Sequence, residues 1–247
     1  MKGVVLCGGL GKRLYPLTQI TNKHLLPIYD RPMVYYPIQT LVEAGIEDIM
    51  IVTGGTHAGD FLKLLGNGEE FGRKRLHYAY QKGEGGIAEA LGLAKSFIGD
   101  DKVIVILGDN ILHGSIKDAV NQFEPEVFGA MVLLWVVEDP TQYGIAKFEK
   151  DKLIEIVEKP KEYIGKSAVI GVYMYDNRVF DIIETLKPSD RGELEITDVN
   201  NAYLKEGTLE YNYFQGWWID AGSSIDSLLE AGNYVKEKMG GKANAKL

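Results

Sequence analysis

The sequence is poor in cysteine, and this scarcity limits how the fold can be held together. Cys7 is the single cysteine among 247 residues, so no disulfide can form within the chain. The fold must then rest on an apolar core, and 45% of the residues are hydrophobic. This cysteine usage fits a reducing compartment, and we expect a cytoplasmic protein.

Long apolar runs and an excess of positive charge are also lacking. The run from Met1 to Leu6 is too short for a signal peptide, and no stretch approaches the ~18 apolar residues of a transmembrane helix. The formal net charge is -8. We therefore expect no partnership with nucleic acid or with a membrane. Any anionic ligand has to be held by a local group of cations.

Linkers rich in glycine, proline or serine are absent, as are repeats and low-complexity tracts. The sequence therefore predicts a single domain over residues 1–247, ending in a tail at residues 240–247. The histidines are scattered, and none has a spacing typical of a zinc site. They are His24, His57, His77 and His113.

Short apolar segments that stop at glycine characterise the first half of the chain. Residues 4–6 precede Gly8, and residues 103–107, the clearest strand signal, precede Gly108. Further strands are expected at residues 48–53 and 76–80, and helices at residues 33–44, 61–65 and 87–97. This alternation predicts an α/β fold with a largely parallel sheet and helices on both faces.

The second half has more strand-like segments. Lys150 and Asp151 separate two apolar runs and predict a hairpin. Strands are expected at residues 130–137, 144–149, 153–157, 168–175 and 209–214, and helices at residues 178–186, 195–205 and 225–238. This half is expected to be more antiparallel than the first.

A glycine-rich, basic turn, Gly8-Gly9-Leu10-Gly11-Lys12-Arg13, follows the first strand. Glycines allow backbone N–H groups to approach a phosphate. A P-loop would need glycine at the position of Leu6 and a hydroxyl residue at that of Arg13. A dinucleotide fingerprint would need a small residue at Leu14 and an acid where Thr53 ends the second strand. Both of these common phosphate-binding motifs are therefore excluded.

The turn continues into a longer pattern. Gly8-Gly9-x-Gly11-x-Arg13-Leu14-x-Pro16-x-Thr18, followed by Lys23-x-Leu25-x-Pro27, closely resembles the signature of the sugar-1-phosphate nucleotidyltransferases. The similarity extends to about Glu230, through segments that include Gly85–Ala90, Leu107–Asn110, Glu158–Pro160, Arg191–Asp198 and Trp218–Gly222. One departure is Lys12, where this family usually has a small hydroxyl residue.

The resemblance implies a three-layer, Rossmann-like (GT-A-like) α/β fold with a mixed, mostly parallel central sheet. Residues 1–115 would form the nucleotide-binding half, and residues 116–240 the sugar-binding half. It further implies transfer of a deoxythymidylyl group from dTTP to glucose 1-phosphate, giving dTDP-glucose and pyrophosphate. The same chemistry with UTP or another sugar phosphate stays open, as does a non-catalytic sugar-nucleotide sensor. A homo-oligomer, dimer or tetramer, is also expected.

Nucleotidyl transfer brings two polyanions together, so it needs cations and a metal more than a general base. By resemblance, Arg13 and Lys23 reach the triphosphate and stabilise the transition state. Asp109 ends the central strand, where an open α/β sheet binds its ligands, and is well placed to hold Mg²⁺. Asp220 resembles the second metal carboxylate of the family. We therefore predict Mg²⁺ as the cofactor, with Asp109 also in the catalytic set.

Gln81 is the candidate for reading the base. Its amide offers a donor and an acceptor, which match the N3–H and O4 edge of thymine or uracil. An amide can flip, so residue type alone leaves cytosine open. The remaining nucleotide-binding candidates are Leu6, Gly8, Gly9, Gly11, Lys12 and Gly86. By resemblance, the sugar-phosphate candidates are Asn110, Tyr143, Gly144, Glu158, Lys159, Val169, Arg191 and Trp218.

Overall fold

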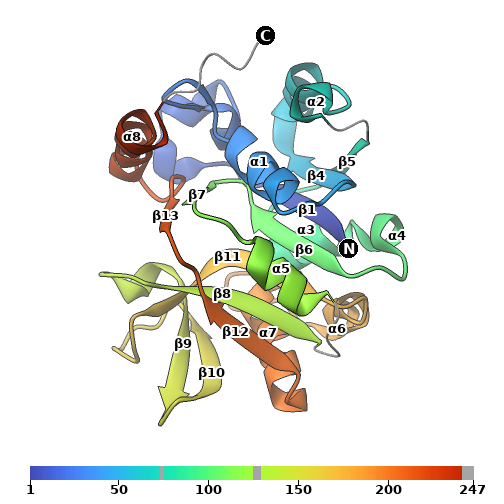
Figure 1. Cartoon of the computed structure of the whole chain (residues 1–247), viewed down its shortest axis with the longest axis vertical. Coiled ribbons are helices and arrows are strands. Elements are labelled where there is room, and N and C mark those ends of the chain that lie inside the picture. The colour runs from blue at the N-terminus through green and yellow to red at the C-terminus, as the bar shows by residue number, and fades with distance from the viewer. Residues whose placement is uncertain (73–74, 125–128, 241–247) are drawn as a thin grey trace.

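The computed structural model describes residues 1–72, 75–124 and 129–240 (Figure 1). Within them, one nine-stranded sheet takes strands from both halves of the chain. Its parallel part has the order β6-β1-β4-β5. These strands are β1 (Lys2–Cys7), β4 (Ile49–Gly54), β5 (Leu76–Gln81) and β6 (Val103–Leu107).

The second half extends the same sheet beyond β6. Strand β11 runs antiparallel to β6, β8 and β9, and β12 is parallel to β8. The hairpin predicted at Lys150 forms between β9 and β10, with Lys150 at a φ of 49°. The strands are β8 (Ala130–Val136), β9 (Gly144–Glu149), β10 (Lys152–Glu158), β11 (Ser167–Tyr175) and β12 (Leu209–Tyr213). The mixed, mostly parallel α/β sheet predicted from the sequence is confirmed.

Helices cover both faces of the sheet, because strand residues of the central strands alternate between two apolar clusters. Val5 and Ile104 face one cluster with α1 (Tyr35–Glu43), α2 (Ala58–Leu65) and α5 (Lys117–Phe123). Val4 and Val105 face the other cluster. That cluster includes α3 (Ile87–Gly92), α4 (Lys95–Ile98), α6 (Val179–Thr185) and α7 (Ile196–Glu206). The result is a three-layer α/β/α arrangement.

A third, smaller core lies under α8 (Ile225–Tyr234), at the upper left of Figure 1. Ser224 caps α8 in a reciprocal capping box with Ser227. The helix ends in a π-turn, Val235–Met239. Two short ladders accompany it: β2 (Pro27–Ile28) with β3 (Arg31–Pro32), and β7 (Asn110–His113) with β13 (Trp217–Asp220).

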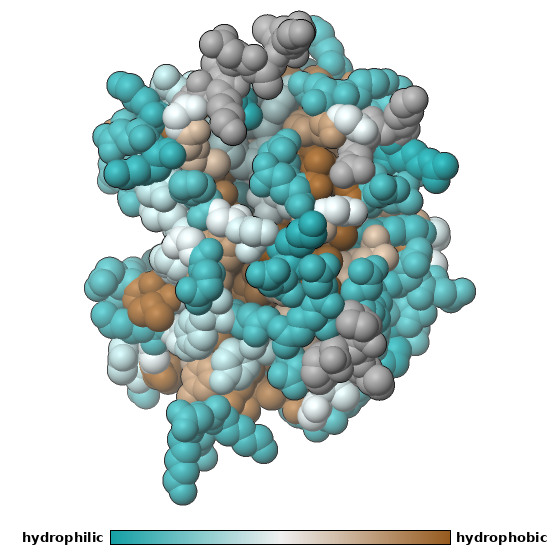
Figure 2. Space-filling view, in the orientation of Figure 1, coloured by the Kyte–Doolittle hydropathy of each residue, from teal (hydrophilic) through white to brown (hydrophobic). Residues whose placement is uncertain are grey.

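Several elements differ from the expectations. The helix expected at residues 87–97 is divided into α3 and α4, with Gly92 ending α3, because glycine weakens a helix. The short elements β7, β13 and α5 carry too little periodicity to be predicted. The tail expected at residues 240–247 lies outside the described residues beyond Gly240. No helix in the described ranges is long and apolar enough to cross a membrane. The face in Figure 2 is largely hydrophilic, with apolar residues in separate groups.

Candidate active site

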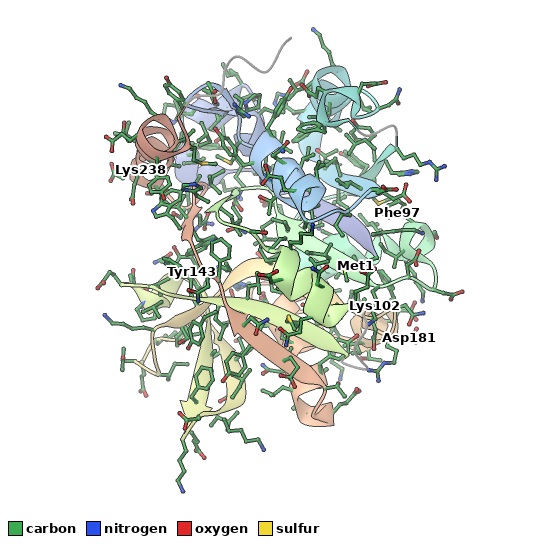
Figure 3. The ribbon with its side chains drawn as sticks, in the orientation of Figure 1. Met1, Phe97, Lys102, Tyr143, Asp181 and Lys238 are labelled. Atoms are coloured by element: carbon green, nitrogen blue, oxygen red, sulfur yellow. The ribbon has the colours of Figure 1, made fainter. Side chains whose placement is uncertain are left out.

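A cleft with a volume of about 270 Å³ opens at the carboxyl ends of the central strands. Ligands of open α/β sheets bind at this edge. The cleft is lined by fourteen of the residues predicted to form the site. They are Leu6, Gly8, Gly9, Arg13, Lys23, Gln81, Gly86, Asp109, Tyr143, Gly144, Glu158, Lys159, Val169 and Asp220. Tyr143 lies at mid-height in Figure 3, between the upper and the lower part of the molecule in this view.

The glycine turn leaves β1 and lines one wall of the cleft. Gly9 and Gly11 have φ angles of 87° and 63°, which side chains rarely adopt. Thr18 fastens the turn, because its hydroxyl donates to the Gly11 carbonyl oxygen over 2.8 Å. Arg13 is exposed, lines the cleft and makes no ion pair with any described residue. Its guanidinium is therefore available to an anionic ligand.

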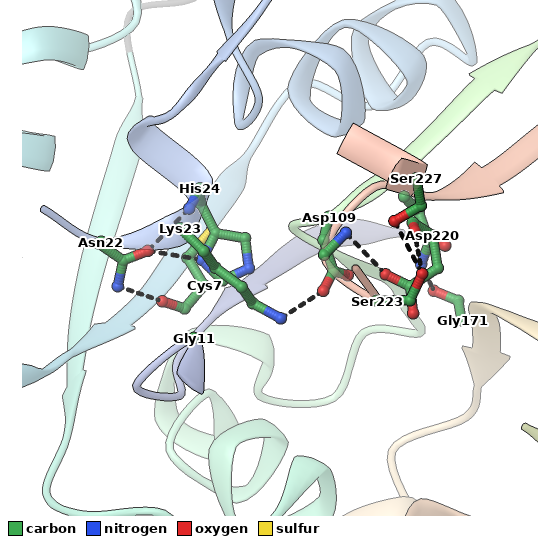
Figure 4. Close-up of polar contacts among 12 residues, drawn as sticks. Cys7, Gly11, Asn22, Lys23, His24, Asp109, Gly171, Asp220, Ser223 and Ser227 are labelled. Carbon is green, nitrogen blue, oxygen red and sulfur yellow. Dashed lines mark hydrogen bonds and ion pairs between the residues drawn. The ribbon is translucent and has the colours of Figure 1, made fainter. Parts of the chain in front are cut away.

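A short helical turn, Lys23–Leu25, holds the second cation in place (Figure 4). The Asn22 side chain caps this turn by accepting from the His24 backbone N–H over 2.9 Å. It also bonds the His24 ring over 2.8 Å. Burial lowers the pKa of His24 to about 3, and the Lys23 charge adds to this effect. His24 is therefore a neutral packing residue that supports Lys23.

The β7–β13 ladder brings Asp220 next to Asp109 although they are far apart in sequence. Asp220 is opposite Asn110 in this ladder, and the Ala221 N–H donates to the Asp109 carbonyl oxygen over 3.0 Å. Gly222 is required for this approach. A Cβ there would lie 2.5 Å from Asp109 Oδ2. The fold thus places two carboxylates at one end of the cleft.

Lys23 compensates part of this negative charge. Its Nζ lies 2.5 Å from Asp109 Oδ2, and this ion pair is the dashed line between the two residues in Figure 4. Burial alone would lower the pKa of Lys23, but the carboxylates of Asp109 and Asp220 outweigh it and raise that pKa. Burial would likewise raise the pKa of Asp109, but the Lys23 charge outweighs it and lowers that pKa. Lys23 and Asp109 therefore form a buried ion pair.

Asp220 is left with less compensation. Burial, followed by the Asp109 charge, raises its pKa from 3.8 to about 6. A buried and a half-buried carboxylate beside one lysine suit a divalent cation. Mg²⁺ is typically held by one or two carboxylates, with substrate phosphates completing its shell. No group of three or more His, Cys, Asp or Glu side chains in the described ranges could hold a metal without such help. The residues present therefore fit a magnesium ion bound together with substrate.

Glu158 and Lys159 also line the cleft, where β10 ends. The Thr197 hydroxyl donates to Glu158 Oε2 over 2.7 Å, which orients the carboxylate. Lys159 has a φ of 45°, and its N–H donates to the Tyr143 carbonyl oxygen over 2.9 Å. This backbone conformation is uncommon for lysine. The hydrogen bond connects Lys159 to Tyr143, and both are predicted sugar-pocket residues.

Five predicted site residues do not line the cleft. Asn110 and Trp218 bond one another, with Trp218 Nε1 donating to Asn110 Oδ1 over 2.6 Å. Arg191 is paired with Glu195 over 2.7 Å and reaches Glu158 at 3.5 Å. The other two, Gly11 and Lys12, belong to the glycine turn, and Lys12 Nζ lies 3.4 Å from Glu84 Oε2.

Nine residues that line the cleft were not predicted from the sequence. The overlooked lining residues are His24, Glu84, Ile87, Ala90, Leu107, Gln142, Tyr173, Glu193 and Ile196. Glu84 had a usable signal, since it is an acid within a glycine-rich segment that carries Gln81 and Gly86. The apolar ones are indistinguishable from core residues in the sequence.

The fold and the site together define a three-layer α/β protein. Its cleft is lined by two cationic side chains, Arg13 and Lys23, and by the carboxylates of Asp109 and Asp220. The family model described as "Nucleotidyl transferase" matches residues 2–238. This match covers nearly the whole chain. The protein belongs to the nucleotidyl transferase family.

Relatives and solved structures agree with this assignment. Glucose-1-phosphate thymidylyltransferases of Neisseria meningitidis and Mycolicibacterium smegmatis are 42% and 44% identical to the chain over 240 residues. These matches cover 96% of this chain and 83% and 82% of the relatives. A crystal structure described as a candidate glucose-1-phosphate thymidylyltransferase from Bacillus anthracis, with a sucrose, has a TM-score of 0.91 at 51% identity and 96% coverage of both chains. A UDP-glucose pyrophosphorylase with UDP-glucose has a TM-score of 0.83 at 26% identity, covering 96% and 98% of the chains.

Proposed function

We propose that the protein transfers a deoxythymidylyl group from dTTP to glucose 1-phosphate, giving dTDP-glucose and pyrophosphate. The observation that carries the proposal is one cleft with Arg13, Lys23 and a carboxylate pair at one end. Gln81 also lines this cleft, on the wall formed by β5, and so does Glu158. The names of the relatives supply the particular substrates.

The reaction is an in-line displacement at phosphorus. A phosphate oxygen of glucose 1-phosphate bonds to the α-phosphorus, and the bond from that phosphorus to the bridging oxygen of the β-phosphate breaks. Pyrophosphate leaves with the electron pair. The sugar phosphate is already ionised near neutral pH, so no side chain has to remove a proton. Arg13 and Lys23 screen the two polyanions and stabilise charge that develops on the leaving group.

Asp109 and Asp220 would hold Mg²⁺ against the phosphate oxygens. When bound, this ion supplies Lewis-acid stabilisation of phosphate charge. Lys23 keeps Asp109 ionised before substrate arrives, because their charges are 2.5 Å apart in a buried site. This role gives Lys23 two tasks, which are to hold a metal ligand in its charged form and to contact phosphate.

The sugar end orients the acceptor. Glu158 accepts hydrogen bonds from sugar hydroxyls, and Lys159 contacts the sugar phosphate. The short bond from Thr197 to Glu158 supports this proposal because it leaves Glu158 Oε1 facing the Lys159 ammonium at 3.7 Å. A carboxylate fixed in this way can select hydroxyl geometry without reorganising.

A parallel assay of pyrophosphate release with dTTP, UTP, CTP and ATP, each with glucose 1-phosphate and Mg²⁺, tests the proposal. We expect dTTP to give the highest kcat/KM. The second candidate is use of UTP, favoured by the similarity to a UDP-glucose pyrophosphorylase. A clear preference for UTP would replace our assignment, and no pyrophosphate with any nucleotide would favour a sugar-nucleotide sensor. Assembly as a homo-oligomer stays a prediction, to be measured by light scattering.

A further inference from the structure

The Gln81 side chain is held in one orientation by two acceptors. Gln81 ends β5 and is 4% exposed. Its Nε2 donates to the Gly86 carbonyl oxygen over 3.2 Å and to Glu89 Oε1 over 3.0 Å. A primary amide nitrogen carries two hydrogens. Both are therefore used within the protein, and the amide has no N–H left for a ligand.

The amide oxygen has the opposite situation. Gln81 Oε1 lies over Gly8 in the wall of the cleft, since a Cβ on Gly8 would be 2.5 Å from it. It accepts no hydrogen bond from the residues that the structure describes. The glycine at position 8 thus leaves the oxygen uncovered on the side where the nucleotide would enter. Gln81 presents an acceptor alone to this part of the cleft.

Glu89, together with the Gly86 carbonyl, favours this orientation. An ionised carboxylate only accepts hydrogen bonds, and so does a backbone carbonyl. Flipping the amide would place Gln81 Oε1 against the Glu89 carboxylate and the Gly86 carbonyl, with three acceptors facing one another. A Cβ on Gly85 would collide with the Glu89 carboxylate, so glycine at this position makes room for it. The residue type of Gln81 alone allows either amide orientation, but the acceptors on Glu89 and Gly86 favour one of them.

We propose that Glu89 is a positioning residue that fixes the Gln81 amide with its oxygen toward the base, so that the site selects pyrimidines with a ring N3–H. Thymine and uracil donate from N3, whereas cytosine presents an unprotonated acceptor there. A cytosine base would place two acceptors together in a largely desolvated site. This inference rests on the proposed use of a nucleoside triphosphate, but not on the identity of the sugar phosphate.

The test measures Kd for dTTP and dCTP with Mg²⁺ in the absence of sugar phosphate, for wild type and Glu89→Gln. A glutamine at position 89 can donate to Gln81 Oε1, so it removes one of the two acceptors that oppose the flipped amide and leaves only the Gly86 carbonyl. We expect wild type to prefer dTTP by tenfold or more, and Glu89→Gln to reduce this preference at least about fivefold. Glu84→Gln is the matched control, because Glu84 also lines the cleft but bonds Leu10 N–H at 3.0 Å and not Gln81. We expect it to change both affinities equally.

A double mutant separates positioning from mere structural support. In a Gln81→Ala background, Glu89→Gln should no longer alter the dTTP:dCTP ratio, because Glu89 acts through Gln81. An equal loss of affinity for both nucleotides in Glu89→Gln, or a wild-type ratio near one, overturns the inference. A preserved ratio effect in protein that cannot use glucose 1-phosphate would contradict the proposed reaction and leave the inference standing.

Discussion

Replacing Asp220 with asparagine should stabilise the metal-free protein while it damages catalysis. Asp220 is a half-buried carboxylate beside Asp109, and desolvation, with that neighbouring charge, raises its pKa from 3.8 to about 6. At 1.36 kcal/mol for each pH unit, this rise corresponds to about 3 kcal/mol. An asparagine keeps the acceptor that the Gly222 N–H uses over 2.9 Å. The variant therefore removes an unfavourable charge without removing that hydrogen bond.

The sign of the effect depends on pH. A carboxyl group whose pKa is higher in the folded state destabilises the fold once pH exceeds its unfolded pKa, because the unfolded chain ionises first and is stabilised by doing so. The cost is absent below 3.8, grows as pH rises toward 6, and is complete above it. The advantage of Asp220→Asn should thus be near zero at pH 4 and reach about 3 kcal/mol at pH 7.5.

Urea unfolding with a chelator present, at several pH values, measures this advantage. In thermal scans, Asp220→Asn should raise Tm by roughly 6–12 °C. Saturating Mg²⁺ should narrow the difference, because a ligand that binds the folded wild type stabilises it. The variant's kcat/KM should fall at least about a hundredfold, since a metal ligand is lost. Unchanged or lower stability of the variant at pH 7.5 would show that the two carboxylates do not oppose each other.

Three further substitutions separate stability from catalysis. Lys23→Met should lower the free energy of unfolding by about 3–5 kcal/mol, because it leaves Asp109 buried without its partner, and unchanged urea midpoints would contradict this. Arg13→Ala should lower kcat by about a hundredfold or more and change the stability by no more than about 0.5 kcal/mol, because Arg13 is exposed and lines the cleft. A small effect on kcat would show that Arg13 does not take part in the reaction. Trp218→Phe should cost about 1–3 kcal/mol by stranding Asn110 Oδ1, with little change in KM for the sugar phosphate, and a large KM change would restore Trp218 to the sugar site.

The parallel half of the fold is readable from the sequence because three of its four strands, β1, β4 and β6, are short apolar runs that stop at a glycine. Residues 103–107 are the clearest example, since a fully buried strand needs no polar alternation. The interruption between α3 and α4 is harder to predict, because Gly92 lowers helix propensity without setting where the helix ends. The ladder of β7 and β13 is too short to show a period of two, so its existence depends on tertiary packing.

The site depends most on the contacts that sequence patterns show least. Asp109 can be placed at a strand end by periodicity, but its meeting with Asp220 is produced by the unpredicted ladder and by the space that Gly222 leaves. The same holds for Gln81, whose residue type allows two amide orientations. The choice between them is made by Glu89, eight positions along the chain and in another element. Residue type therefore sets which chemistry is available, whereas the neighbours supplied by the fold decide which atom of each side chain faces the ligand.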